Sequence, residues 1–163
     1  MIISNESYPP CLLQRLLDDE PRTSTESARG KFDYDERRMH AIIKENITDI
    51  LNTVNSEKAV NRERYPHPAA SVVNFGIAAM VGEYSMAQRW CQHEQQIREA
   101  IIRFEPRIAA ETLVIALLGD IQSPACNGII HFEIRAIVQL SSYSFGLRLN
   151  AHYDIENESA VIK

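Results

Sequence analysis

The spacing of apolar residues changes at Pro106, and this change restricts the folds that the chain can adopt. Before Pro106, apolar side chains recur every three or four positions, whereas after it they alternate with polar ones. The first spacing is that of an amphipathic helix and the second that of a half-buried strand. Proline separates the two because it lacks an amide hydrogen and disfavours helical backbone at the residue before it. The pattern therefore predicts helices first and a sheet second.

Two helices are predicted between residue 33 and Pro106. One follows Asp33 or Asp35, both suitable N-caps, and its apolar stripe comprises Met39, Ile43, Ile47, Ile50 and Val54. The other starts at Ser85, which forms a capping box with the glutamine three residues on, and its stripe comprises Met86, Trp90, Ile97, Ile101 and Phe104. Residues 55–83 contain prolines and glycines, so we expect mostly loop there, with one helical turn.

Strands are predicted in the second part. Residues 111–118, ETLVIALL, are apolar on both faces, and residues 130–139 and 145–155 alternate between apolar and polar. The links between them are short, which favours an antiparallel meander over crossover connections. We therefore predict an α+β fold in which helices pack on one face of a three- to four-stranded antiparallel meander sheet. The tail AVIK, at 160–163, would supply the fourth strand.

The first 32 residues differ from the rest of the chain. CLLQRLLDDE, at 11–20, has leucines at helical spacing and indicates a short amphipathic helix. Residues 21–32 have few apolar side chains and cannot bury enough surface to fold alone, so we predict a flexible linker there. Residues 33–163 are then a single α+β domain, long enough to build one core without disulfides or a structural metal.

Charge and segment composition exclude several classes of protein. The chain has 17 Lys+Arg against 22 Asp+Glu, a net charge of −5, which argues against nucleic-acid binding. The first ten residues do not resemble a secretory signal, and no apolar run approaches the roughly 20 residues that span a bilayer. We expect a cytoplasmic protein without direct membrane insertion. Cys11, Cys91 and Cys126 are widely spaced and fit buried reduced thiols better than a disulfide framework.

No catalytic, metal or cofactor motif is complete. His93 and Glu94 resemble the start of a zinc-protease motif, but Ile97 occupies the place of its second histidine. Of the five histidines, His131 and His152 alone could share the outward face of paired strands, and we favour a solvated or hydrogen-bonded role for them over metal ligation. The carboxylates offer no distinguishable acid and base. We therefore predict no catalytic residues, no metal and no cofactor.

The sequence Glu105-Pro106-Arg107 stands out because it lies where helix changes to strand. One reading is a helix stop flanked by surface charges. The other is that proline holds a carboxylate and a guanidinium in a fixed geometry, so that the pair docks a partner through charge-assisted hydrogen bonds. As a surface residue, Arg107 could then be changed to alanine at a cost of only about 1 kcal/mol of stability.

Four blocks, in this order, carry a family resemblance over nearly the whole chain: LLQRLLDDEP at 12–21, DILNT at 49–53, YPHPAASVVNFGI at 65–77 and FEPRI at 104–108. With them the chain resembles the TssE family, the baseplate wedge subunits of type VI secretion systems, which are related to a phage baseplate wedge protein once labelled a lysozyme. The resemblance implies a structural subunit of a cytoplasmic baseplate near the inner membrane, on which a contractile sheath polymerises.

The same resemblance implies partners and contact residues. The partners would be TssF, TssG and TssK in the wedge and TssB and TssC in the sheath. The family's Glu-Pro-Arg signature maps onto Glu105, Pro106 and Arg107 and would contact the wedge core, while Asn74, Phe75 and Gly76 are further partner-binding candidates. The family also resembles the strand-exchanging domain of the sheath, which would let it template the first sheath ring. Three positions depart from the family: Val54 replaces an arginine, Phe75 a tyrosine and Ala79 an aspartate.

Two other functions remain open at this stage. The old family label suggests a peptidoglycan hydrolase, although such an enzyme would normally need an export signal. A regulatory adaptor of the anti-adaptor kind, which shares a related fold, is the other alternative.

Overall fold

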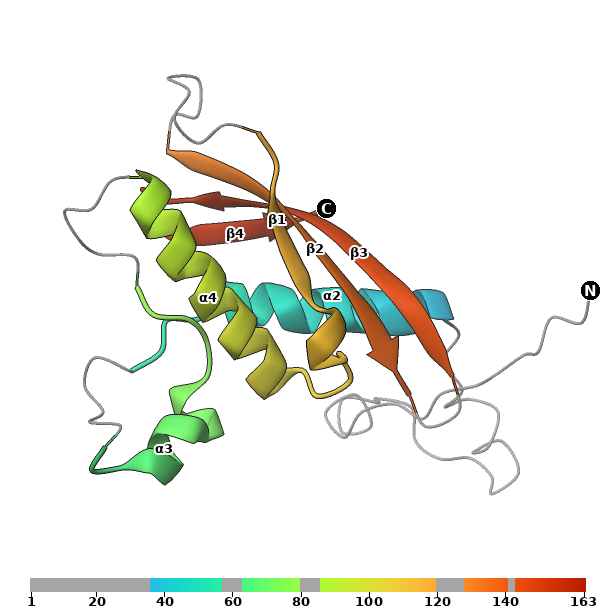
Figure 1. The fold of residues 1–163 in the computed structure, drawn as a ribbon, viewed down its shortest axis with the longest axis horizontal. Coiled ribbons are helices and arrows are strands. Elements are labelled where there is room, and N and C mark those ends of the chain that lie inside the picture. Colours follow the sequence, from blue (N-terminus) through green and yellow to red (C-terminus); the bar gives the residue numbers. More distant parts are fainter. Residues whose placement is uncertain (1–35, 57–62, 80–85, 120–127, 141–142) are drawn as a thin grey trace, which may run out of the picture. The chain divides into compact units, whose positions relative to one another are not determined.

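The computed structural model describes residues 36–56, 63–79, 86–119, 128–140 and 143–163 (Figure 1). The chain divides into two compact units, Met1–Ile43 and Lys44–Lys163. The predicted N-terminal helix and linker, residues 1–32, lie outside the described residues, so that division of the chain stays a prediction. In the described part of the chain, no helix combines the length and the apolar character needed to cross a membrane.

Both helices predicted between residue 33 and Pro106 are present. Helix α2 spans Glu36–Asn52 and α4 spans Met86–Phe104, and α4 ends directly before the Glu105-Pro106 step, as proline requires. Between them lie the short helix α3, Pro66–Ala70, and the 3₁₀ turn η1, Val72–Asn74. The predicted start of the second helix at Ser85 lies outside the described residues.

The position of Val54 corrects the predicted apolar stripe. Helix α2 ends at Asn52, two residues earlier than the stripe implied. Val54 instead forms a parallel bridge with Ile77, and its side chain is 56% exposed. Two backbone hydrogen bonds of 2.9 Å pair this stretch with Ile77, from Ile77 N to Thr53 O and from Asn55 N to Ile77 O. The helix therefore does not continue beyond Asn52.

The sheet confirms the predicted α+β meander. Its strands are β1, Val114–Leu117, β2, Ile129–Gln139, β3, Ser144–Asp154, and β4, Ser159–Ile162, and each is antiparallel to the next in the order β1-β2-β3-β4 (Figure 1). The first strand is shorter than predicted because Ala110–Thr112 forms a second 3₁₀ turn, η2. There, the Thr112 hydroxyl accepts the Ile137 N–H at 2.9 Å and replaces a strand partner for β2.

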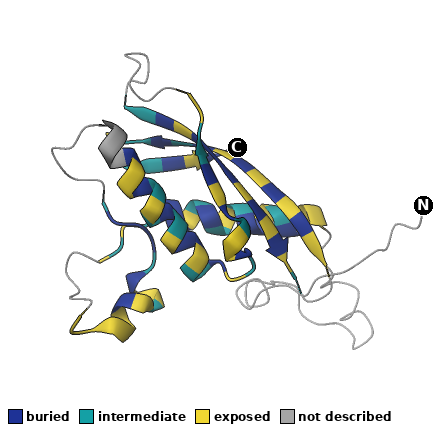
Figure 2. Ribbon diagram, in the orientation of Figure 1, coloured by how far each residue is buried: buried dark blue, intermediate teal, exposed yellow. Residues whose placement is uncertain are grey.

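Helices cover one face of this sheet. Buried and exposed residues alternate along β3, as expected for a strand with one face in the core (Figure 2). On the covered face, Trp90 of α4 contacts Phe132, with ring centroids 5.2 Å apart, and His93 contacts Tyr153 at 4.4 Å. The Asn52 side chain, at the end of α2, donates to Ala160 O at 2.9 Å and accepts from Ala160 N at 2.7 Å. We call the opposite face the open face because, among the described residues, it carries exposed side chains of all four strands.

The outer edge of β3 is only partly paired. Strand β4 pairs with Ala151–Asp154, and Lys163 N donates to Asn150 O at 2.8 Å. Because backbone groups of alternate residues point the same way in a strand, the N–H and C=O groups of Ser144, Gly146 and Arg148 point to the same outer side as Asn150 O. Within the described residues, no strand pairs with that stretch.

Cys91 differs from the expectation of buried thiols. It is a free cysteine, but it is exposed, because Trp90 and His93 on either side of it turn the inward face of α4 to the core. Cys11 and Cys126 lie outside the described residues.

Candidate partner-binding site

The corner that contains Glu105, Pro106 and Arg107 is fixed at both ends. Glu105 N donates to Ile101 O at 2.8 Å and so completes the last turn of α4. After the corner, Gln139 N donates to Arg107 O at 2.7 Å, and Ala109 N donates to Ile137 O at 2.9 Å. These bonds tie the end of α4 to strand β2, so the corner cannot move independently of the sheet.

The carboxylate of Glu105 is buried, with 1% of the side chain exposed. Arg107 donates two hydrogen bonds of 2.6 Å to it, from Nε to Oε1 and from Nη2 to Oε2. Asn46 of α2 adds a third donor, Nδ2 to Oε2, at 3.1 Å. Such bidentate pairs are among the strongest hydrogen-bonded ion pairs in proteins, and they fix the direction of the guanidinium.

The structure therefore gives the three corner residues different roles. Glu105 faces inward, whereas Pro106 is exposed and 22% of the Arg107 side chain reaches solvent. A partner would meet Pro106 and Arg107, and Glu105 would act by holding Arg107 in place. The sequence predicted that the pair lies where helix changes to strand, and the structure has it there, but the sequence could not distinguish a displayed carboxylate from a buried one.

Asn74 and Gly76 shape the loop after α3. Asn74 is buried; its Nδ2 donates to Ala69 O and its Oδ1 accepts from Ser56 N, each at 3.1 Å. Gly76 has a φ of 101°, and a Cβ atom there would lie 2.0 Å from Thr53 O. Glycine is the residue that tolerates both this backbone conformation and this approach. Both residues thus hold the loop in shape from within.

Phe75 brings the two groups of predicted site residues together. Its ring is half-buried and lies 4.9 Å, centroid to centroid, from the ring of Phe104, which directly precedes Glu105. Arg103 of α4 adds a hydrogen bond from Nη1 to Ala69 O at 3.2 Å. The loop therefore packs on the end of α4, and all six candidates belong to one region of the second unit.

Sequence reasoning missed two of the most exposed apolar residues in this region. Val72 and Val73 form the 3₁₀ turn before Asn74 and are 79% and 78% exposed. Adjacent exposed valines are unusual because each leaves apolar surface in water, and contiguous apolar patches mark interaction sites. The sequence marks them only as part of the apolar run SVVNFGI. This run is too short to show a periodicity that would distinguish buried residues from exposed ones.

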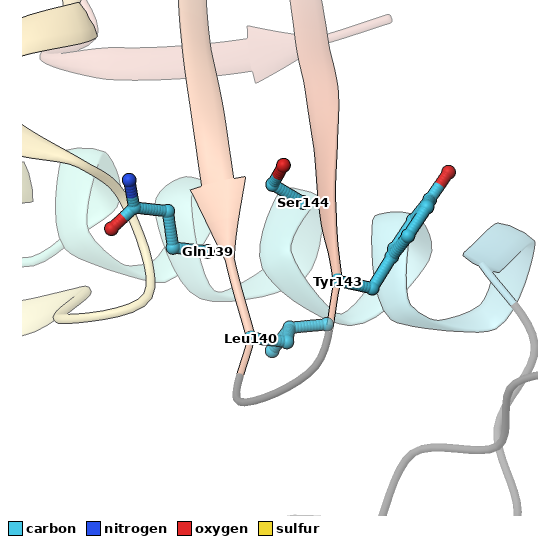
Figure 3. A pocket seen from close by; sticks show the side chains of 4 residues that line it. All are labelled: Gln139, Leu140, Tyr143 and Ser144. Carbon is cyan, nitrogen blue, oxygen red and sulfur yellow. The ribbon is translucent and has the colours of Figure 1, made fainter.

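Other parts of the described residues offer little for chemistry. Among them, no three His, Cys, Asp or Glu side chains are grouped so that they could hold a metal ion. Gln139, Leu140, Tyr143 and Ser144 line a shallow pocket at the β2–β3 turn, and Figure 3 shows the side chains of Gln139 and Tyr143 pointing apart. An open pocket without converging polar groups is not suited to orienting a substrate.

Comparison with known proteins identifies a family for the chain. Residues 37–143 match the profile of a family described as baseplate wedge protein gp25, and the match includes both groups of candidate residues. A crystal structure of a Geobacter sulfurreducens protein provisionally described as a tail lysozyme is similar, with a TM-score of 0.44 and 22% identity; the match covers 69% of this chain and 88% of that one. No curated protein sequence matches the chain.

Proposed function

Because the chain belongs to the family of baseplate wedge protein gp25, we propose that it is a structural subunit of a type VI secretion baseplate. It joins TssF, TssG and TssK in the wedge and helps to template the contractile sheath of TssB and TssC. The observation that carries this proposal is the buried Glu105 carboxylate, which holds the partly exposed Arg107 guanidinium in a fixed direction. The baseplate would lie in the cytoplasm near the inner membrane.

The geometry of Arg107 suits a docking residue. A long side chain normally loses conformational freedom when it binds, and that loss opposes association. Arg107 is already ordered by two hydrogen bonds to Glu105, so less freedom remains to be lost. The exposed part of Arg107, Pro106 beside it and the valines Val72 and Val73 of the loop offer a wedge partner one charged and several apolar contacts.

The proposed sheath contact rests on the edges of the sheet. An uncovered strand edge presents backbone N–H and C=O groups that can pair with a strand of another chain. The outer edge of β3 at Ser144, Gly146 and Arg148 is a site where a sheath strand could be added, in keeping with the family's likeness to the strand-exchanging domain of the sheath.

The proposed role is not enzymatic. A glycosidase needs two carboxylates in different environments, one of them held protonated as the acid. The two buried carboxylates of the described residues, Glu105 and Glu133, are each engaged in ion pairs with arginine. We expect the purified protein to release no more saccharide from peptidoglycan than a heat-inactivated sample does, and release above that level would restore the hydrolase alternative.

Co-purification tests the assembly role. The tagged chain should retain wedge subunits from a strain that contains TssF and TssG, and should lose them when either is deleted. An adaptor would bind its target alone, so unchanged binding in the deletion strains would favour that alternative.

A matched pair of variants tests the docking surface. Replacing Glu105 and Arg107 together by leucine removes the guanidinium without leaving a buried charge. We expect this double variant to fold but to lose the wedge subunits and sheath assembly, while Arg37→Ala, an exposed arginine on α2, keeps both. A folded double variant that still assembles would show that Arg107 is not the docking residue.

A further inference from the structure

Two histidines face each other on the open side of the sheet. His131 of β2 and His152 of β3 are directly opposed in the strand register. Their ring centroids lie 5.8 Å apart, with 43° between the ring planes. His131 is exposed and His152 is partly exposed, so both rings can be reached from solvent.

The backbone places these two side chains as close as opposed residues can be. The carbonyl of His131 accepts a hydrogen bond from Leu118 N at 2.8 Å, so the backbone groups of His131 point toward β1 and not toward β3. His131 and His152 are therefore a non-hydrogen-bonded pair of the antiparallel ladder. In such pairs the Cα atoms are about 4.5 Å apart, and the side chains are closer than in the alternate pairs.

The ring separation is close to that of two imidazoles on one metal ion. Metal–nitrogen bonds of about 2.0–2.1 Å in tetrahedral geometry place the two ring centroids roughly 5 Å apart. Small rotations about the side-chain bonds of two accessible histidines bridge the difference from 5.8 Å. No movement of the backbone is needed.

Neighbouring carboxylates are engaged elsewhere. Glu133, on the same face as His131, is bound by Arg135 at 3.1 Å and by Arg148. Asp154, two residues beyond His152, accepts hydrogen bonds from Glu156 N and from Asn157 on its two oxygens. Within the described residues, the two imidazoles are therefore the donors that remain available at this place, which agrees with the finding that no group of three ligands is present there.

Contrary to the expectation from the sequence, we propose that His131 and His152 together bind one divalent transition-metal ion, with water in its remaining coordination positions. Imidazole nitrogen is a ligand for Cu²⁺, Ni²⁺ and Zn²⁺, whereas Ca²⁺ and Mg²⁺ take oxygen ligands. The affinity should be highest for Cu²⁺, in the usual order of divalent ions. The bound ion would link the two central strands, β2 and β3.

Calorimetric titration of the full chain, with any purification tag removed, tests the site. Titrations of CuCl₂, NiCl₂ and ZnCl₂ should each show a site that depends on both histidines, and CaCl₂ none. Each of the variants His131→Gln and His152→Gln should weaken binding by at least the roughly 10- to 100-fold that loss of an outer-shell partner costs. The double variant should be little weaker than either single one, because a lone imidazole gives no chelate. His67→Gln, an exposed histidine on α3, is the matched control and should bind as wild type does.

A second readout separates the site from effects on folding. With Zn²⁺ added, nuclear magnetic resonance of the histidine rings should show chemical-shift changes at His131 and His152 only. The melting temperature should rise in the wild type but not in the double variant. Equal affinity in wild type and both single variants, or shifts confined to other histidines, would contradict the proposal. If His152→Gln has a lower melting temperature than the wild type in the absence of metal, His152→Asn is titrated in its place under the same criteria.

Discussion

Arg107 and Glu105, only two residues apart, form a bidentate ion pair in which one partner is buried and the other reaches the surface. The same device recurs on the open face of the sheet, where the buried Glu133 binds both Arg135 and Arg148. Arg135 and Arg148 are directly opposed in the register of β2 and β3, an arrangement that is unfavourable for like charges. In each case a buried carboxylate fixes the position of one or two arginine side chains that remain partly exposed to solvent.

The first prediction is that Arg107→Ala destabilises the protein far more than a surface substitution does. Removing one partner of a buried pair leaves an uncompensated charge and costs about 3–5 kcal/mol. The sequence alone suggested about 1 kcal/mol. Urea denaturation of the wild type, of Arg107→Ala and of the Glu105→Leu, Arg107→Leu double variant measures this difference.

The double variant should recover most of the lost stability, because no charge is stranded. Arg135→Ala is the matched control: Arg148 still pairs with Glu133, so its cost should stay within about 1 kcal/mol. Equal midpoints for wild type and Arg107→Ala would mean that the pair does not hold the corner.

The second prediction concerns two glycines. Gly76→Ala should destabilise the protein by more than about 2 kcal/mol, because φ is positive and the new Cβ would collide with Thr53 O. Gly146→Ala is the control, since a Cβ there meets no atom within 4 Å; alanine in a strand should be neutral or slightly stabilising. Thermal melting of the two variants under the same conditions decides the matter, and similar melting temperatures would refute the close approach at Gly76.

The third prediction is a loss of stability in mild acid that depends on His93. Burial lowers the pKa of His93 to about 4 from an ordinary value of 6.5. Neither ring nitrogen has a hydrogen-bond partner in the described structure. The fold therefore favours the neutral ring, and its contribution is complete above pH 6.5 and lost as the pH falls toward 4.

The loss over that range should reach about 3 kcal/mol, since each pKa unit corresponds to about 1.4 kcal/mol. Urea denaturation between pH 4 and pH 7.5 measures it. His93→Phe should flatten this part of the profile, because phenylalanine fills the site beside Tyr153 without titrating. His67→Gln, which changes an exposed histidine, should leave the profile as in wild type, and an unchanged profile in His93→Phe would assign the acid sensitivity to other groups.

Much of the fold was predictable because each element has a strong local signal. The change of period at Pro106, the stripe of α4 and the alternation along β2 and β3 each depend on which side chains face the core. The ends of elements were less predictable. The early end of α2 and the short β1 depend on hydrogen bonds to residues distant in sequence, from Ile77 to Thr53 and from Ile137 to Thr112.

The position of the Glu105-Pro106-Arg107 corner in the fold was predictable, but the burial of its side chains was not. Glu105 and Glu133 are ordinary glutamates in the sequence, and their burial results from arginines and from packing that only the folded chain brings together. Likewise, nothing local marks Val72 and Val73 as exposed, since valine normally favours the interior. The change from helix to strand and the family resemblance both pointed to the corner, and the structure shows which of its side chains are buried and which are exposed.

The last prediction locates the sheath contact on the outer edge of β3. The backbone N–H groups of Ser144, Gly146 and Arg148 point outward, whereas those of Phe145, Leu147 and Leu149 point to β2. Amide hydrogen exchange of the assembled wedge should therefore be fast at the first three residues and slow at the second three. Adding sheath protein should slow exchange at the first three while the second three stay unchanged, because strand addition satisfies alternate backbone groups only. Protection that rises at residues 112–118 or 160–162 instead would move the contact to the β1 or β4 edge, and protection confined to helices would replace strand addition by docking through side chains.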